Sequence, residues 1–155
     1  MATDRVLIGW GYLVELILAV LLYAAAATFR VPSDIPAFIL KTGSSWTSTL
    51  EVLLALSGAL LIAVVANLFL TDFGKFLSER GAGGIYMWAY GSVALIFLIS
   101  TVALKLTSWS QADGLLRTAF IMLLYSAINS VTLIKNTVEL AGLLLKHRSH
   151  KEWKS

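Results

Sequence analysis

Cysteine is absent from the chain, and histidine occurs only as His147 and His150, both within the last ten residues. The first absence excludes disulfide bonds, thiol nucleophiles and cysteine-ligated metal sites. The second leaves the apolar segments without a histidine that could act as a catalytic base or as an axial haem ligand. No nucleophile–base pair and no paired acid–base motif stands out either. We therefore predict a protein that is not an enzyme and that has neither a cofactor nor a metal centre.

Charged residues are also scarce, at 14% of the chain against about 25% in a typical soluble domain. Hydrophobic residues make up 58%, and the mean hydropathy is +0.81. So few charges cannot cover a globule of 155 residues, so much of its surface must face lipid. About 20 apolar residues are needed to cross a bilayer as a helix, and four unbroken segments meet that length: residues 6–29, 50–71, 85–106 and 117–145. The sequence predicts an all-α integral membrane protein, a single domain over residues 1–155 that forms a bundle of four transmembrane helices.

The distribution of lysine and arginine predicts the orientation, because cytoplasmic loops are enriched in both. The side that holds both termini carries seven of these residues and the other side four: Arg5, Lys75, Arg80, Lys146, Arg148, Lys151 and Lys154 against Arg30, Lys41, Lys105 and Arg117. We expect both termini in the cytoplasm, as in a multi-pass protein of a plasma or inner membrane. The tail of residues 146–155 is interpreted as a basic collar at a helix end and not as a nucleic-acid-binding segment.

Two connections complete this prediction. Residues 30–49 form an external loop in which the apolar piece of residues 37–40 is too short to span, so that it lies in the interface or dips back into the bundle. Residues 72–84 form a flexible cytoplasmic loop that ends in a glycine-rich turn.

Small residues predict how the helices pack, since close backbone approach drives helix association in lipid. The second segment has Ala55, Ala59, Ala63 and Asn67 at a spacing of four, and the first has Gly11, Glu15, Ala19 and Ala26 on one face. We expect these two faces to pack against each other. The fourth segment has a polar stripe that should face protein or water, formed by Tyr125, Asn129, Thr132, Asn136 and Glu139.

Three charges fall within the spans: Glu15, Lys135 and Glu139. With cytoplasmic boundaries at residues 7 and 145, their depths are ~12, ~15 and ~9 Å at about 1.5 Å per residue. Asn67 lies ~6 Å deep on the same basis. These four residues and Asn136 are predicted to form one polar cluster. Two interpretations stay open: the charges neutralise one another and join the first helix to the fourth, or the surplus carboxylate binds a cation or a proton.

Four spans with a glutamate in the first resemble the small multidrug-resistance transporters. The resemblance covers Glu15 and the number of spans. It does not extend to the longer chain, the polar fourth helix or the basic tail, and it assigns no family.

Two functional hypotheses follow. The first is a small oligomeric channel or transporter with an intramembrane cation or proton site. The alternative is a non-catalytic scaffold or accessory subunit of a larger membrane complex. Both hypotheses place the chain in a lipid bilayer. Its expected partners are further copies of the chain or other membrane proteins, and no nucleic acid is expected to bind.

Overall fold

The computed structural model describes the backbone of residues 2–152 and the side chains of residues 10–147. This part of the chain contains five helices and no strand: α1 (Ala2–Phe29), α2 (Ile35–Leu70), α3 (Asp72–Glu79), α4 (Ala82–Trp109) and α5 (Asp113–Glu152). All but α3 are long and apolar enough to cross a membrane. The side chains of Arg5 and of the predicted basic tail beyond His147 lie outside the described residues.

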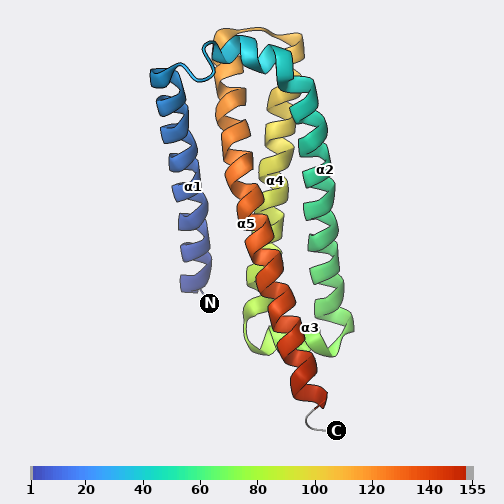
Figure 1. Cartoon of the computed structure of the whole chain (residues 1–155). Coiled ribbons are helices and arrows are strands. Elements are labelled where there is room, and N and C mark those ends of the chain that lie inside the picture. The colour runs from blue at the N-terminus through green and yellow to red at the C-terminus, as the bar shows by residue number, and fades with distance from the viewer. Residues whose placement is uncertain (1, 153–155) are drawn as a thin grey trace.

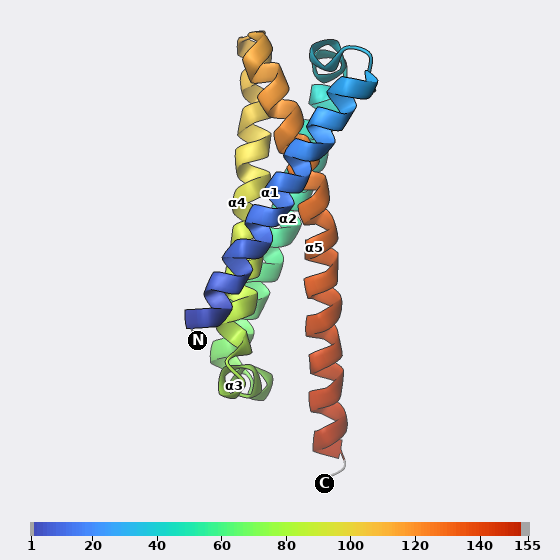
Figure 2. The same ribbon diagram turned by 90° about the vertical axis from the view of Figure 1, so that its left-hand side faces the viewer.

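The body of the molecule consists of α2, α4 and α5, and α1 packs outside it (Figure 1). The most extensive contact is between α2 and α4, and α1 contacts mainly α5. In the orthogonal view, α1 crosses the body obliquely (Figure 2). The beginning of α1, the short helix α3 and the end of α5 lie at one end, which we call the terminal end. The connections α1–α2 and α4–α5 lie at the other, the loop end.

The body is held together by a regular seam of buried residues. On α4 they alternate at spacings of three and four: Gly83, Tyr86, Tyr90, Val93, Phe97, Ser100, Leu104 and Thr107. This period of 3.5 is the pattern of helices that wind around each other. Two seam positions, Ser100 and Thr107, are small hydroxyl residues, which permit close approach. Where α4 meets α5, Ser126 donates a hydrogen bond to Ser100 Oγ over 2.7 Å, and both side chains are buried.

Helix α2 begins about fifteen residues before the predicted span, and most of the expected external loop is helical. Asp34 caps its first turn by accepting a hydrogen bond from the backbone N–H of Ala37 over 3.1 Å. The first turns lie across the loop end of the body before the helix turns down (Figure 1). The hydroxyls of Thr42 and Thr47 donate to carbonyls four residues earlier, an arrangement that often bends helices. The apolar piece of residues 37–40 thus packs on the body, where Ile39 is fully buried.

The four predicted spans correspond to α1, α2, α4 and α5, but the bundle has a fifth helix, because residues 72–79 form α3 where a flexible loop was predicted. The Thr71 hydroxyl caps this helix by accepting from the Gly74 N–H over 3.1 Å. Phe73 and Leu77 are buried against the body, and the remaining polar side chains are exposed. Eight residues are too few for a span, so a search for long apolar runs does not detect such an amphipathic turn.

The predicted packing of α1 on α2 is also wrong. Ala55, Ala59 and Ala63 are exposed on the outer face of α2. The face that α2 turns inward repeats every seven residues, through Gly43, Leu50, Ser57 and Val64. Leu50 and Val64 belong to the buried core of the body, and their branched side chains fill it more completely than alanine would.

Candidate functional site

Helix α1 touches the body through one narrow face. Its buried or half-buried side chains are Tyr12, Glu15, Ala19, Tyr23 and Ala26. Their spacing of three or four residues places them on one side of a helix, and Ala19 is fully buried there. The predicted contact between the first and the last long helix is therefore present, between α1 and α5.

Glu15 is the only acidic residue on this face. Its Oε1 accepts a hydrogen bond of 2.5 Å from the Thr132 hydroxyl on α5, while its Oε2 is buried and has no partner. Asn129, one turn before Thr132 and fully buried, donates through Nδ2 to the carbonyl of Tyr125 over 2.9 Å. Its Oδ1 is likewise buried without a partner. Among the side chains of residues 10–147, these two oxygens are the only buried polar atoms without a hydrogen-bond partner.

Two tyrosines add hydrogen bonds that join α1 to α4 and α5 to α1. The Tyr12 hydroxyl donates to the carbonyl of Ala89 over 2.9 Å, and the Tyr125 hydroxyl donates to the carbonyl of Tyr12 over 3.2 Å. Tyr12 was not singled out from the sequence. The available signal was its position three residues before Glu15, which places both side chains on one helix face.

Lys135 and Glu139 lie apart from Glu15. The Lys135 Nζ is 4.0 Å from Glu139 Oε1, and the two side chains are 72% and 53% exposed. Within the described side chains, no ion pair joins Lys135 to Glu15. Asn136 is half-buried on the same part of α5. The charge-neutralising link between the first and fourth spans is thus replaced by a hydrogen bond between a hydroxyl and a carboxylate.

Asn67 is also separate from Glu15. Its Nδ2 donates to the Ala63 carbonyl over 2.8 Å, and its Oδ1 accepts from the Thr71 hydroxyl over 3.3 Å. It lines a small pocket of about 70 Å³ with Phe73, Leu77 and Leu140, where α2, α3 and α5 meet. Of the predicted cluster and stripe, the structure brings together Glu15, Tyr125, Asn129 and Thr132. We call these four residues, with Tyr12, the Glu15 site.

The chemistry of the Glu15 site follows from its donors and acceptors. A carboxylate and an amide oxygen are acceptors, and neither unpartnered oxygen has a donor. Leaving a buried acceptor unpaired costs about 1–3 kcal/mol. A proton on Glu15 Oε2 would turn that oxygen into a donor, and a small cation would be attracted by either oxygen. No group of three or more histidine, aspartate or glutamate side chains that could hold a metal occurs in the described part of the chain.

Comparison of the chain with models of protein families, with curated proteins and with solved structures found no match. The functional argument consequently rests on the Glu15 site and on the distribution of apolar surface.

Proposed function

We propose that this chain is a multi-pass membrane protein whose hydrocarbon belt lies between two levels of exposed tryptophan. Trp88 and Trp109 on α4 are 54% and 87% exposed, and tryptophan is enriched at both membrane interfaces. The roughly 21 residues between them rise ~31 Å as a helix, which matches a hydrocarbon core of about 30 Å. On α1, the span of 20 residues from Trp10 to Phe29 has a similar length.

This placement changes the depths expected from the sequence. The Tyr90 hydroxyl donates to Thr137 over 3.2 Å, so on these antiparallel helices Glu139 lies near the level of Trp88 and Lys135 lies ~6 Å inside it. Water and headgroups reach Glu139 directly, and the long Lys135 side chain can extend its ammonium group toward the boundary. Glu15, five residues beyond Trp10, lies inside the hydrocarbon region at a depth of ~7 Å. The excess of lysine and arginine in the sequence of the terminal end favours a cytoplasmic position for both termini.

For its function we propose a small channel or transporter in which Glu15 binds a proton or a cation. The observation that carries the proposal is the pair of buried, unpartnered oxygens, Glu15 Oε2 and Asn129 Oδ1. A carboxylate inside the bilayer is costly, and an ionisable residue there is functional by default. The Thr132 hydroxyl orients the carboxylate and leaves its second oxygen free for the ion.

Flux through the purified chain tests this proposal. Proteoliposomes are expected to dissipate an imposed proton, sodium or potassium gradient faster than protein-free liposomes prepared from the same lipid. An internal pH-sensitive dye or an ion-sensitive dye reports the rate. Rates equal to the protein-free control for all three ions would contradict a transport function.

We further propose that the chain forms homo-oligomers through the outer face of α2. The exposed stripe of Ala55, Ala59 and Ala63 lets a second helix approach closely, which is the way helices associate in lipid. A second copy of the chain would also add walls around an ion path. The same stripe equally favours the alternative function, a scaffold that docks to a different membrane protein.

Cross-linking separates self-association from docking to a partner. Because the natural chain lacks cysteine, Ala59→Cys introduces a unique thiol. Mild oxidation in native membranes is expected to give a covalent dimer. Val131→Cys, on the exposed face of α5, is the matched control and should remain monomeric. Equal cross-linking of both variants would count against the α2 interface, and stoichiometric co-purification of another membrane protein would favour the scaffold function.

A further inference from the structure

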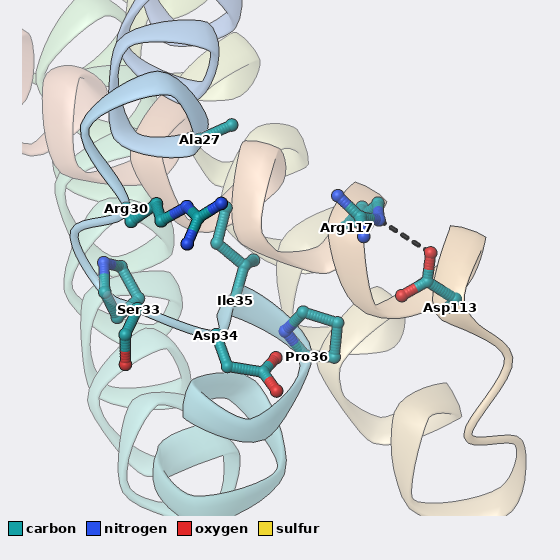
Figure 3. Close-up of a pocket in the computed structure, with 9 residues that line it drawn as sticks. Ala27, Arg30, Ser33, Asp34, Ile35, Pro36, Asp113 and Arg117 are labelled. Atoms are coloured by element: carbon teal, nitrogen blue, oxygen red, sulfur yellow. Dashed lines mark hydrogen bonds and ion pairs between the residues drawn. The ribbon is translucent and has the colours of Figure 1, made fainter.

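A polar pocket of about 500 Å³ opens at the loop end, away from the Glu15 site (Figure 3). It lies between the end of α1, the start of α2 and the start of α5. Its polar lining comes from Ser33 and from four charged side chains, Arg30, Asp34, Asp113 and Arg117. Ala27, Ile35 and two prolines supply much of the remaining lining. The sequence analysis counted these charges only for orientation.

Arg117 and Asp113 form an ion pair with each other, whereas Arg30 and Asp34 each have polar atoms that could bind a ligand. Arg117 Nε lies 2.7 Å from Asp113 Oδ2, and Arg117 Nη1 donates to the Tyr23 hydroxyl over 3.3 Å. Arg30 has no ion pair among the described side chains, and its guanidinium extends toward the side of the pocket where Arg117 lies (Figure 3). Asp34 uses Oδ1 to cap α2, which leaves Oδ2 available. A ligand here meets an unpaired guanidinium and a free carboxylate oxygen.

The charges specify the ligand. Guanidinium groups bind phosphate through several parallel hydrogen bonds. A carboxylate oxygen accepts hydrogen bonds from a primary ammonium group. Two arginines and two aspartates give the lining no net charge, so a zwitterion is neutralised group by group, whereas an anionic ligand leaves one charge uncompensated. The matching class is phosphoethanolamine, with the phosphate at Arg30 and the ammonium at Asp34.

The position of the pocket indicates a lipid as the source of this group. In the membrane placement proposed above, on which this inference rests, the last turn of α1 lies at the headgroup level. Phe29 and Val31 next to the pocket are strongly exposed, so they provide an apolar surface for the glycerol and acyl chains. We propose that the pocket binds the headgroup of phosphatidylethanolamine.

Lipid retention by the full-length chain tests the proposal. The protein is equilibrated with equal amounts of phosphatidylethanolamine, phosphatidylcholine and phosphatidylglycerol, and the bound lipid is identified by native mass spectrometry. Phosphatidylethanolamine is expected to exceed each of the others at least about fivefold, because choline cannot donate to Asp34 and glycerol carries no charge for it. Arg30→Gln should lower the retention of all three lipids, because each of them carries the phosphate that Arg30 binds. Asp34→Asn should reduce ethanolamine to the level of choline while the helix cap persists, since asparagine caps as well as aspartate.

Lys105→Gln is the matched control, because it removes one cation at the same end of the molecule, where Lys105 pairs with Glu51 over 2.6 Å. It should leave both the retention of the three lipids and the preference among them intact. Equal retention of the three lipids, or the same loss in Lys105→Gln as in Arg30→Gln, would overturn the proposal. Titration with glycerophosphoethanolamine and with inorganic phosphate gives the second arm. Binding of either as tight as that of the lipid would overturn the lipid assignment in favour of a soluble phosphate compound. Glu15→Gln should not alter lipid retention, because Glu15 does not line this pocket. A failure of the lipid proposal can therefore be distinguished from a failure of the transport proposal.

Discussion

Replacing Glu15 by glutamine is expected to reduce ion flux in proteoliposomes to the protein-free background, a loss of at least about tenfold, because positioned proton-transfer groups contribute roughly 10²–10⁴-fold to a rate. Glutamine is nearly isosteric with glutamate, and its carbonyl can still accept from the Thr132 hydroxyl. Its amide nitrogen also offers a donor where the carboxylate has none. We therefore expect stability to change by no more than about 1 kcal/mol. Flux and unfolding in mild detergent, measured on the same preparation, separate function from folding.

Glu139→Gln is the matched control for this experiment. Glu139 is the same residue type, but its side chain is 53% exposed and paired only loosely with Lys135. Exposed pairs of this kind contribute about 0–1 kcal/mol, so this variant should retain both flux and stability. Wild-type flux in Glu15→Gln, or equal losses in the two variants, would remove Glu15 from the ion path.

Gly74→Ala is expected to destabilise the fold by roughly 3 kcal/mol, at the upper end of the usual ~1–3 kcal/mol for overpacking. A Cβ atom at position 74 would lie 1.9 Å from the carbonyl oxygen of Asn67 and 2.6 Å from the Cα of Leu68. Both are backbone atoms, so no side-chain rotation relieves the clash. The substitution should displace α3 from the end of α2. Unfolding in mild detergent measures the loss of stability, and proteolysis of residues 71–81 reports the displacement.

Gly84→Ala is the control for this prediction, since a Cβ atom there meets nothing within 4 Å. Alanine favours helix over glycine by about 1 kcal/mol in a helix interior, so this variant should be as stable as the wild type or slightly more stable. If Gly74→Ala behaves like Gly84→Ala, the close packing of α3 against α2 is wrong.

The predictable part of the candidate site followed from helix periodicity. The polar stripe placed Tyr125, Asn129 and Thr132 on one face of the last helix, and Glu15 was expected at a similar depth on the first. The sequence could not show which of three charged side chains would be enclosed. The structure encloses Glu15 against Thr132 of α5 and leaves Lys135 and Glu139 on an exposed face of that helix.

Composition and run length alone determined that the chain is helical and has four segments able to cross a membrane, because both properties are sums over neighbouring residues. The side that each helix buries is not a local property. Ala55, Ala59 and Ala63 looked like an interface, yet Leu50, Ser57 and Val64 are the residues that α2 buries, and the alanines face outward. Only the tertiary structure shows which face of α2 is buried. It also shows that Glu15 Oε2 is buried without a hydrogen-bond partner. Burial of that oxygen depends on three helices that meet from distant parts of the chain.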